Sequence, residues 1–258
     1  MVVSTSATVM EKVIRLERST FEVALARAVE VLNTGGVVAL PTDTVYGLTS
    51  LLRHSDSLYK IKGRHPDKPL GLFISNVDQL NKWAVQTVDM PTLRRLLPGP
   101  VTLILDRSIR LPSSFNPSTR KVGIRIPENR FVQELCARLD EPLAQTSANT
   151  IGIRIPENRF VQELCALLDE PLAQTSANTS GGTSPISVNE FSKLWGELDL
   201  VIDTGTVGQE HGDNAREGST VVDLTLDTYS IIRNGCARMR TEHVLRDSGI
   251  TATTDFTL

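Results

Sequence analysis

The 258-residue chain has few of the residues that form disulfide frameworks or metal sites: it contains three cysteines and four histidines. The cysteines, Cys136, Cys165 and Cys236, form no Cys-x-x-Cys pair, so neither a disulfide framework nor a zinc site is predicted. The four histidines show no ligand spacing either. We therefore expect reduced thiols, no protein-bound metal and a cytoplasmic protein.

The chain also has few aromatic residues (5%) and a formal net charge of −3. A protein that coats nucleic acid nonspecifically needs excess positive charge and stacking platforms, so broad RNA contact is disfavoured. No apolar run approaches the roughly 20 residues that span a bilayer, and we expect no membrane span. Residues 1–20 lack the apolar block of a secretory signal, and their mixed charges indicate a mitochondrial fraction only weakly.

Standard nucleotide-binding motifs are missing as well. No Gly-Lys pair occurs, which excludes a Walker A loop, and no Gly-x-Gly-x-x-Gly follows an expected strand. What is present is a cluster of cations, Lys60, Lys62, Arg64 and Lys68, around Gly63 in a chain that is acidic overall. Cations at a helix end can simply be solvated there. Because Gly63 breaks the helix between them, their side chains can also converge, as is typical of sites for a triphosphate.

An internal duplication interrupts the second half of the chain. Residues 123–150 recur as residues 152–179, an offset of 29 residues, with Arg138 replaced by Leu167 as the one difference. Solenoid repeats diverge and recur several times, so a recent tandem duplication, or an exon retained twice, fits better. A fold built for one copy has one place for this unit, and we expect the other copy to lie outside it.

Alternating helical and strand-like segments predict an α/β fold, with an open, twisted, mixed sheet flanked by helices. A capping box of Ser19 and Glu22 predicts the start of the first helix, which ends at Leu32 before two glycines. Each repeat copy reads as a strand, a helix and a second strand, and residues 209–218 read as a mobile loop. Further strands are expected at residues 37–40, 70–74, 101–105, 200–203, 220–224 and 229–233, and further helices at residues 55–62, 78–84, 91–97, 188–198 and 242–246.

Two groups of small polar residues follow expected strands. Pro41 to Leu48 reads Pro-Thr-Asp-Thr-Val-Tyr-Gly-Leu, a turn whose hydroxyls and amides can bind a small polar ligand or merely cap the turn. Thr-Ser-Ala-Asn occurs in both copies, as Thr146 to Asn149 and as Thr175 to Asn178. The second copy leads into Ser180-Gly181-Gly182, which suits close approach to a phosphate.

Taken in order, these motifs resemble the YrdC-like family of threonylcarbamoyl-AMP synthases. The order is Pro-Thr-Asp-Thr-Val-Tyr-Gly-Leu, Lys-Gly-Arg, Pro-Gly-Pro-Val-Thr, Gly-Ile-Arg-Ile-Pro, Thr-Ser-Ala-Asn, Gly-Ser-Thr-Val-Val-Asp and Ile-Ile-Arg. The resemblance extends over residues 20–240 and suggests the single-domain type. It implies a positively charged cavity and a nucleotidyltransferase that makes threonylcarbamoyl-AMP from L-threonine, bicarbonate and ATP, with Mg²⁺ on the phosphates. The product would pass to a complex that modifies tRNA beside the anticodon.

The resemblance also assigns residues to roles. Lys62 and Arg64 are the catalytic candidates. The candidates for ATP binding are Lys62, Arg64, Lys68, Ser176, Asn178 and Arg233, and those for threonine binding are Thr42, Tyr46, Thr102, Arg154 and Ser219. The duplication leaves open whether the first copy supplies Ser147, Asn149 and Arg125 in place of Ser176, Asn178 and Arg154.

The expected organisation is a flexible segment over residues 1–18, the catalytic domain over 19–240, and a C-terminal helix with a polar tail over 241–258. One rival interpretation is an RNA-binding or assembly factor of the same fold without synthase activity. Another is a carbamoyl-transfer enzyme of hydrogenase maturation, which would need further zinc-finger and acylphosphatase-like domains for which this chain has no room.

Overall fold

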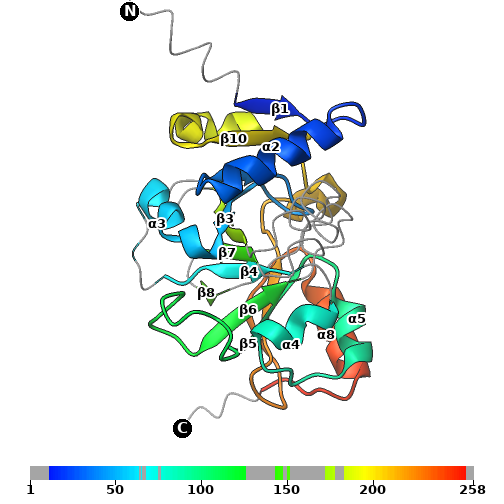
Figure 1. Ribbon diagram of the computed structural model, residues 1–258. Helices are drawn as coiled ribbons and strands as arrows, with labels where there is room; N and C mark the ends of the chain where they lie inside the picture. The colour runs from blue at the N-terminus through cyan, green and yellow to red at the C-terminus, as the bar shows by residue number, and fades with distance from the viewer. Residues whose placement is uncertain are drawn as a thin grey trace, which may run out of the picture.

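A mixed β-sheet runs through the part of the chain that the computed structural model describes, residues 12–63, 65, 68–74, 77–125, 143–147, 150–151, 172–177 and 183–253 (Figure 1). Its strands follow the order β1-β10-β2-β3-β9-β7-β4-β6-β5-β11-β12, and β8 pairs with β7. Parallel and antiparallel pairs alternate irregularly, which confirms the mixed α/β class. The strands are β1 (Val13–Arg15), β2 (Val38–Leu40), β3 (Gly47–Leu51), β4 (Gly71–Phe73), β5 (Val101–Asp106), β6 (Lys121–Arg125), β7 (Leu143–Ser147), β8 (Thr150–Ile151), β9 (Leu172–Ser176), β10 (Leu200–Asp203), β11 (Thr220–Asp223) and β12 (Ser230–Arg233).

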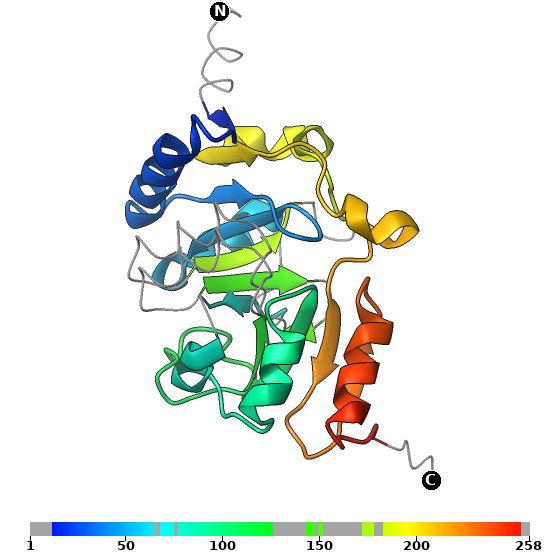
Figure 2. The same ribbon diagram turned by 90° about the vertical axis from the view of Figure 1, so that its right-hand side faces the viewer.

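Helices gather at both ends of this sheet. Figure 1 shows α2 beside β1 and β10 at one end, and α4, α5 and α8 around β5 and β6 at the other; α5 and α8 pack against each other there (Figure 2). The α-helices are α2 (Phe21–Asn33), α3 (Asp56–Lys62), α4 (Leu80–Trp83), α5 (Met90–Leu96) and α8 (Arg238–Asp247). The 3-10 helices are η1 (Leu52–His54), η2 (Val77–Gln79), η3 (Val188–Glu197) and η4 (Gln209–Asn214).

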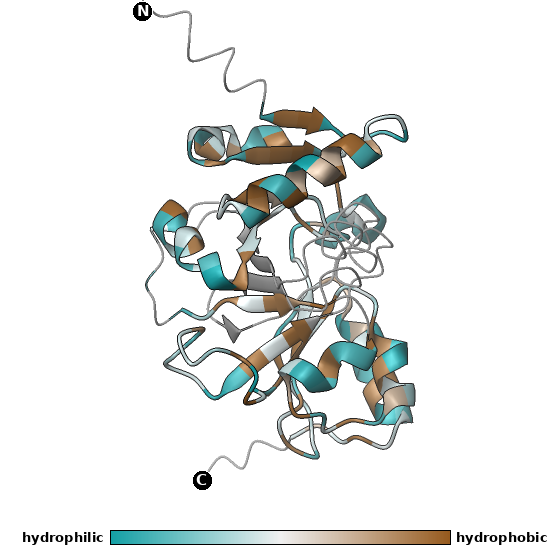
Figure 3. Ribbon diagram, in the orientation of Figure 1, coloured by the Kyte–Doolittle hydropathy of each residue, from teal (hydrophilic) through white to brown (hydrophobic). Residues whose placement is uncertain are grey.

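The hydrophobic core follows from the patterning. All three residues of β2 are fully buried, and hydrophobic residues recur along the sheet strands (Figure 3). In α2 the buried residues are Ala24, Leu25, Ala28, Val31 and Leu32, the spacing of one helix face. Gly35, at φ +88°, ends this helix as the paired glycines predict.

The start of α2 differs from the expected capping box. Thr20, not Ser19, precedes the helix, and its side chain does not cap it. The Thr20 hydroxyl instead donates to the carbonyl of Arg15 at 2.7 Å and accepts from the N–H of Glu17 at 2.9 Å. The expectation was therefore wrong because the threonine closes the turn before the helix.

Several elements were missed or misjudged from the sequence. Val13–Arg15 forms β1, parallel to β10, although it falls in the segment expected to be flexible. Gly47–Leu51 forms β3, which no periodicity indicated. Residues 188–198, expected to be one helix, form the 3-10 element η3 with a kink at Phe191.

The duplicated unit enters the sheet with strands from both copies. The second strands, β7 and β9, lie side by side and parallel, with Thr146 opposite Thr175. Gly71 of β4 lies opposite both Gln145 and Gln174. Both second strands therefore belong to the sheet, which differs from the expectation that one copy lies outside it, but they meet β4 at the same residue, Gly71.

Candidate functional site

Thr42 organises the turn that links β2 to β3. Its hydroxyl accepts hydrogen bonds from the N–H of Thr44 at 3.1 Å and of Val45 at 3.0 Å, and donates to the carbonyl of Val45 at 2.6 Å. Threonine fixes tight turns through such bonds to its own backbone. The side chain is 3% exposed. The Thr42 hydroxyl is therefore engaged in holding the turn. A ligand that binds here would contact other groups of the turn.

Tyr46 anchors the end of the same turn in the core. Its hydroxyl donates to the carbonyl of Gly205 at 2.8 Å and accepts from the N–H of Thr204 at 3.0 Å. Its ring lies 5.6 Å from that of Phe191, and the residue is fully buried. Burial raises the pKa of Tyr46 to about 12. The side chain expected to contact threonine thus joins β3 to the segment after β10.

Residues 204–215 cover this turn. The Nε2 atom of His211 lies 2.9 Å from the carbonyl oxygen of Asp43. Gly208 has φ +71°, and a Cβ atom there would lie 2.4 Å from the carbonyl oxygen of Thr44. Part of the segment expected to be a mobile loop is therefore the 3-10 helix η4, which begins beside the Thr42 turn.

The second repeat copy ends beside this turn. Ser176, the last residue of β9, lies opposite Gly47 of β3, and the N–H of Ala177 donates to the carbonyl of Tyr46 at 3.0 Å. The first copy's Ser147 ends β7 and lies opposite Thr150 of β8. The backbone of Ser176 therefore adjoins the Thr42 turn, whereas that of Ser147 pairs with β8. Asn149, Asn178 and Arg154 lie outside the described residues.

The cationic segment spans the end of α3, as expected. Gly63 adopts the left-handed conformation, φ +56° and ψ +34°, and ends the helix directly after Lys62. Lys62 is only 7% exposed, whereas Lys60 and Lys68 are exposed. A solvated helix end accounts for Lys60 but not for Lys62, which the protein covers almost completely. Arg64 lies outside the described residues.

Two residues that sequence reasoning missed hold the chain beyond this segment. The buried side-chain amide of Asn116 accepts from the N–H of Leu70 at 2.8 Å and donates to the Leu70 carbonyl at 2.6 Å. Asn116 itself has φ +49°, a conformation that asparagine tolerates better than most residues. The Arg107 guanidinium donates to five carbonyls of the adjoining loop, those of Leu111, Pro112, Phe115, Asn116 and Thr119. Neither residue lies in a recognisable motif, so the sequence offered no signal for them.

A third group joins three predicted site residues. The hydroxyls of Thr102 and Ser219 lie 2.9 Å apart, although 117 residues separate them in sequence. The Arg233 guanidinium donates to the Ser219 carbonyl at 2.7 Å and to its hydroxyl at 3.0 Å. Thr102 and Ser219 are buried. Thr102 and Ser219 were expected on the threonine side and Arg233 on the nucleotide side, yet the three form one hydrogen-bonded cluster.

The strand register separates these groups. Ser176, the Thr42 turn and the residues just before β4 lie at one end of their strands. The Thr102–Ser219–Arg233 cluster lies at the opposite end, where β6 also finishes at Arg125. A ligand that contacts both the Thr42 turn and the Thr102–Ser219–Arg233 cluster must therefore lie across a face of the sheet. It cannot lie at one end of the strands.

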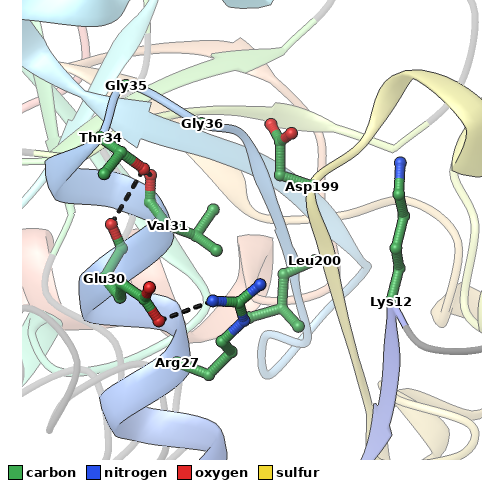
Figure 4. Close-up of a pocket in the computed structure, with 9 residues that line it drawn as sticks. All are labelled: Lys12, Arg27, Glu30, Val31, Thr34, Gly35, Gly36, Asp199 and Leu200. Carbon is green, nitrogen blue, oxygen red and sulfur yellow. Dashed lines mark hydrogen bonds and ion pairs between the residues drawn. The ribbon is translucent and has the colours of Figure 1, made fainter.

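A cavity of about 670 Å³ lies elsewhere, between α2 and strands β1 and β10. Figure 4 shows the ion pair of Arg27 and Glu30 on one side, with Asp199 and Lys12 on the other. The polar groups of that second side are engaged: Lys12 donates to the Leu198 carbonyl at 2.7 Å, and Asp199 accepts from the N–H of Val37 at 2.8 Å. None of the predicted site residues lines this cavity.

Within the described part of the chain, no group of three or more His, Cys, Asp or Glu side chains is placed to hold a metal ion. Over the same residues, no helix has the length and apolar character needed to cross a membrane.

Comparison with known proteins follows the same motifs. A family model described as telomere recombination (Sua5/YciO/YrdC) matches residues 30–150 and 149–235, and the boundary falls where the two repeat copies meet. The chain is 38% identical to a threonylcarbamoyl-AMP synthase of Bos taurus over 238 residues, which is 91% of this chain and 76% of that protein.

Two solved structures of Pyrococcus abyssi Sua5 have the same fold. The chain superposes on a doubly substituted variant of that protein with a TM-score of 0.69 at 25% identity, covering 93% of this chain and 61% of that longer one. For a Sua5 structure complexed with L-threonine the TM-score is 0.64 at 25% identity, covering 86% of this chain and 56% of that one. The family model matches most of the chain, and the bovine relative is 38% identical over 91% of it. The chain therefore belongs to the Sua5/YciO/YrdC family.

Proposed function

We propose that this chain is an L-threonylcarbamoyladenylate synthase, which forms threonylcarbamoyl-AMP and pyrophosphate from L-threonine, bicarbonate and ATP. The observation that carries the proposal is the 38% identity to the bovine synthase across 91% of the chain. The match to the family model, over residues 30–150 and 149–235, spans the Thr42 turn, the cationic segment and the Thr102–Ser219–Arg233 cluster. A nucleotidyltransferase is therefore the function that these residues support best.

The reaction needs little covalent participation by the protein. The threonine amine and bicarbonate give a carbamate and release water. One carbamate oxygen then attacks the α-phosphorus of ATP while the bond to pyrophosphate breaks. Catalysis of such a step rests on alignment of the reactants and on neutralisation of negative charge. Cations at the nucleotide and a rigid frame for the amino acid are what the enzyme must provide.

The nucleotide side of the site falls to the cationic segment. In this proposal Lys62, Arg64 and Lys68 surround the triphosphate, and Lys62 and Arg64 neutralise the charge that develops during transfer. Ser176 and Asn178 complete the site from the end of the second repeat copy. The low exposure of Lys62 supports this role, because a cation surrounded by protein interacts with phosphate more strongly than one in open solvent.

The threonine side falls to the Thr42 turn and to the cluster at the other end of the strands. Since the hydroxyls of Thr42 and Tyr46 are held by backbone groups, we assign them as positioning residues that fix the turn. Thr102 and Ser219 can accept or donate within the cluster, and Arg233 supplies its charge. A repeat arginine, Arg125 or Arg154, would add a second cation there.

Mg²⁺ remains part of the proposal. The described residues offer no carboxylate cluster for it, which fits an ion carried mainly by phosphate oxygens and water, as Mg²⁺ often is. When bound it would neutralise phosphate charge. Further predictions concern the surroundings of the enzyme. They are a positively charged cavity at the site, hand-over of the product to a tRNA-modifying complex, RNA contact, a cytoplasmic location and a mitochondrial fraction.

The test is release of pyrophosphate from ATP in the presence of bicarbonate, with and without L-threonine. A synthase gives threonine-dependent pyrophosphate, and mass spectrometry detects the adenylate. L-Serine and D-threonine serve as matched control substrates. Pyrophosphate release that does not depend on the amino acid, or tight RNA binding without any release, would overturn the proposal in favour of an RNA-binding factor of the same fold.

A further inference from the structure

The two repeat copies contribute different ends of the duplicated unit to the sheet. The first copy supplies β6, which pairs with β4 and β5 and brings Arg125 to the end of the sheet where Thr102 lies. The second copy supplies β9, which pairs with β3 along its whole length, from Leu51↔Leu172 to Gly47↔Ser176. Neither copy alone occupies both positions.

Unique sequence on the N-terminal side fixes the first strand. Lys121 precedes the repeat, and its ammonium lies 2.7 Å from the Asp223 carboxylate of β11. The N–H of Arg107 donates to the Arg120 carbonyl at 2.9 Å. If the second copy's strand replaced β6, Thr150 would stand where Lys121 stands, and the ion pair with β11 would be lost.

Unique sequence on the C-terminal side fixes the last strand. The N–H of Tyr46 donates to the Pro185 carbonyl at 2.9 Å, and the N–H of Val207 donates to the Ile186 carbonyl at 2.9 Å. These bonds hold the chain just beyond the second copy against the Thr42 turn. The copy that continues directly into this segment is therefore the one whose last strand reaches β3.

The inner halves of the repeat are used differently. Thr150 and Ile151, at the junction of the copies, form β8 and fold back on β7, with Thr146 opposite Ile151 and Ser147 opposite Thr150. The first copy's serine thus pairs within a hairpin. Extra chain between two fixed ends adds little to loop-closure entropy, since each doubling of length costs only about 0.6 kcal/mol.

We propose that the synthase site is a hybrid, with Arg125 taken from the first copy and Ser176 from the second. Arg125 joins the Thr102–Ser219–Arg233 end of the strands, and Ser176 joins the Thr42 turn. Their duplicates, Arg154 and Ser147, have no role in catalysis or binding in this proposal. This assignment rests on the proposed function for the roles of the two residues, but not for the strand positions.

Four single substitutions to alanine test the roles, and each has a duplicate in identical local sequence as its control. Arg125→Ala should lower threonine-dependent pyrophosphate formation about tenfold or more relative to Arg154→Ala, the loss expected of a hydrogen bond to a charged group. Ser176→Ala should do so relative to Ser147→Ala. Sensitivity of Arg125 together with Ser147, or of Arg154 together with Ser176, would show a site built from one copy and overturn the proposal.

Cysteine cross-links test the last strand without activity, in a chain whose own cysteines are changed to serine. Thr49→Cys with Gln174→Cys places the two sulfurs on opposed residues of β3 and β9, within reach of a disulfide. Thr49→Cys with Gln145→Cys is the matched control, because β7 pairs with β9 and β4 whereas β3 pairs with β9. Oxidation of the control pair in preference to the first would overturn the assignment of β9.

The same comparison applies to β6. Leu103→Cys with Ile124→Cys joins opposed residues of β5 and β6, and Leu103→Cys with Ile153→Cys is the control. Preferential oxidation of the control pair would overturn the assignment of β6. The cross-links can form as expected while neither the unsubstituted protein nor any variant releases pyrophosphate in a threonine-dependent manner. In that case the proposed function fails and the strand assignment stands.

Discussion

The hydroxyl of Tyr46 donates to the carbonyl of Gly205 at 2.8 Å, 159 residues away in sequence. The same oxygen accepts from the N–H of Thr204 at 3.0 Å. The Asp203 carboxylate accepts in turn from the N–H of Gly205 at 2.8 Å and forms an ion pair with Arg15 of β1 at 3.0 Å. One buried phenol thereby connects the turn before β3, the end of β10 and the first strand of the sheet.

Removal of the phenol oxygen should destabilise the protein. Tyr46→Phe keeps the ring against Phe191 but leaves the N–H of Thr204 and the carbonyl of Gly205 without their partner. We expect a loss of about 1–3 kcal/mol in the free energy of unfolding, the cost of unsatisfied buried polar groups. Urea unfolding measures it, with Tyr59→Phe, a partly exposed tyrosine, as the matched control. Equal losses in both variants would contradict the buried role of Tyr46.

The same residue predicts a dependence of stability on alkaline pH. Burial raises the pKa of Tyr46 to about 12, whereas an unfolded tyrosine titrates near 10. Above pH 10 the unfolded chain releases this proton first, so the stabilisation present below pH 10 is lost as pH rises toward 12, by at most about 1.4 kcal/mol per pH unit. The difference in unfolding free energy between the native protein and Tyr46→Phe should shrink over this range. A difference that stays constant with pH would rule this out.

Lys62 and Lys60 offer a matched pair for the nucleotide site. Both lie in the last turn of α3, but Lys62 is 7% exposed and Lys60 is exposed. Lys62→Ala should weaken ATP binding about tenfold or more, because a charge-assisted contact is lost, while Lys60→Ala changes it less than about twofold. Isothermal titration calorimetry with a non-hydrolysable ATP analogue gives both affinities. Circular dichroism checks that α3 persists, and equal affinities for the two variants would remove Lys62 from the site.

Arg107 should be irreplaceable by lysine. Its planar guanidinium donates to five carbonyls in the loop before β6, a geometry that a single ammonium cannot reproduce. Burial also lowers the pKa of Arg107, and the partners in these contacts are all carbonyls rather than carboxylates. Arg107→Lys should cost roughly 2 kcal/mol of stability and open residues 111–119 to proteolysis, because partly buried carbonyls lose their donors. Arg110→Lys, an exposed neighbour, should do neither.

Local sequence patterns anticipated the elements whose cause is local. The apolar run before Pro41 predicted β2, and Gly63 predicted the end of α3, because burial and left-handed backbone conformation are properties of single segments. The capping box at Ser19 failed for a related reason: the adjacent Thr20 has a hydroxyl too, and the chain before the helix decides which one closes the turn. Strand β3 was hidden because Gly47–Leu51 alternates poorly and is buried on both faces.

The sequence predicts a set of candidate site residues but not how they are arranged. Motif order pointed to Thr102, Ser219 and Arg233 one by one, yet nothing local shows that two hydroxyls 117 residues apart meet at 2.9 Å. Arg107 and Asn116 act through backbone carbonyls and amides, which carry no sequence signature. The repeat made a further limit plain, since identical sequences take up different strand positions according to the unique residues on either side.

Gly208 gives a last test, of the segment that covers the Thr42 turn. It has φ +71°, and an added Cβ would lie 2.4 Å from the Thr44 carbonyl oxygen. Gly249 has a similar φ of +78° but nothing within 4 Å of an added Cβ, so it isolates the conformational strain of about 1–2 kcal/mol. Gly208→Ala should therefore destabilise the protein more than Gly249→Ala does. It should also raise the KM for threonine, because η4 must move off the turn. Thermal unfolding and threonine-dependent pyrophosphate release measure the two effects, and equal behaviour of the variants would show that this contact does not position the turn.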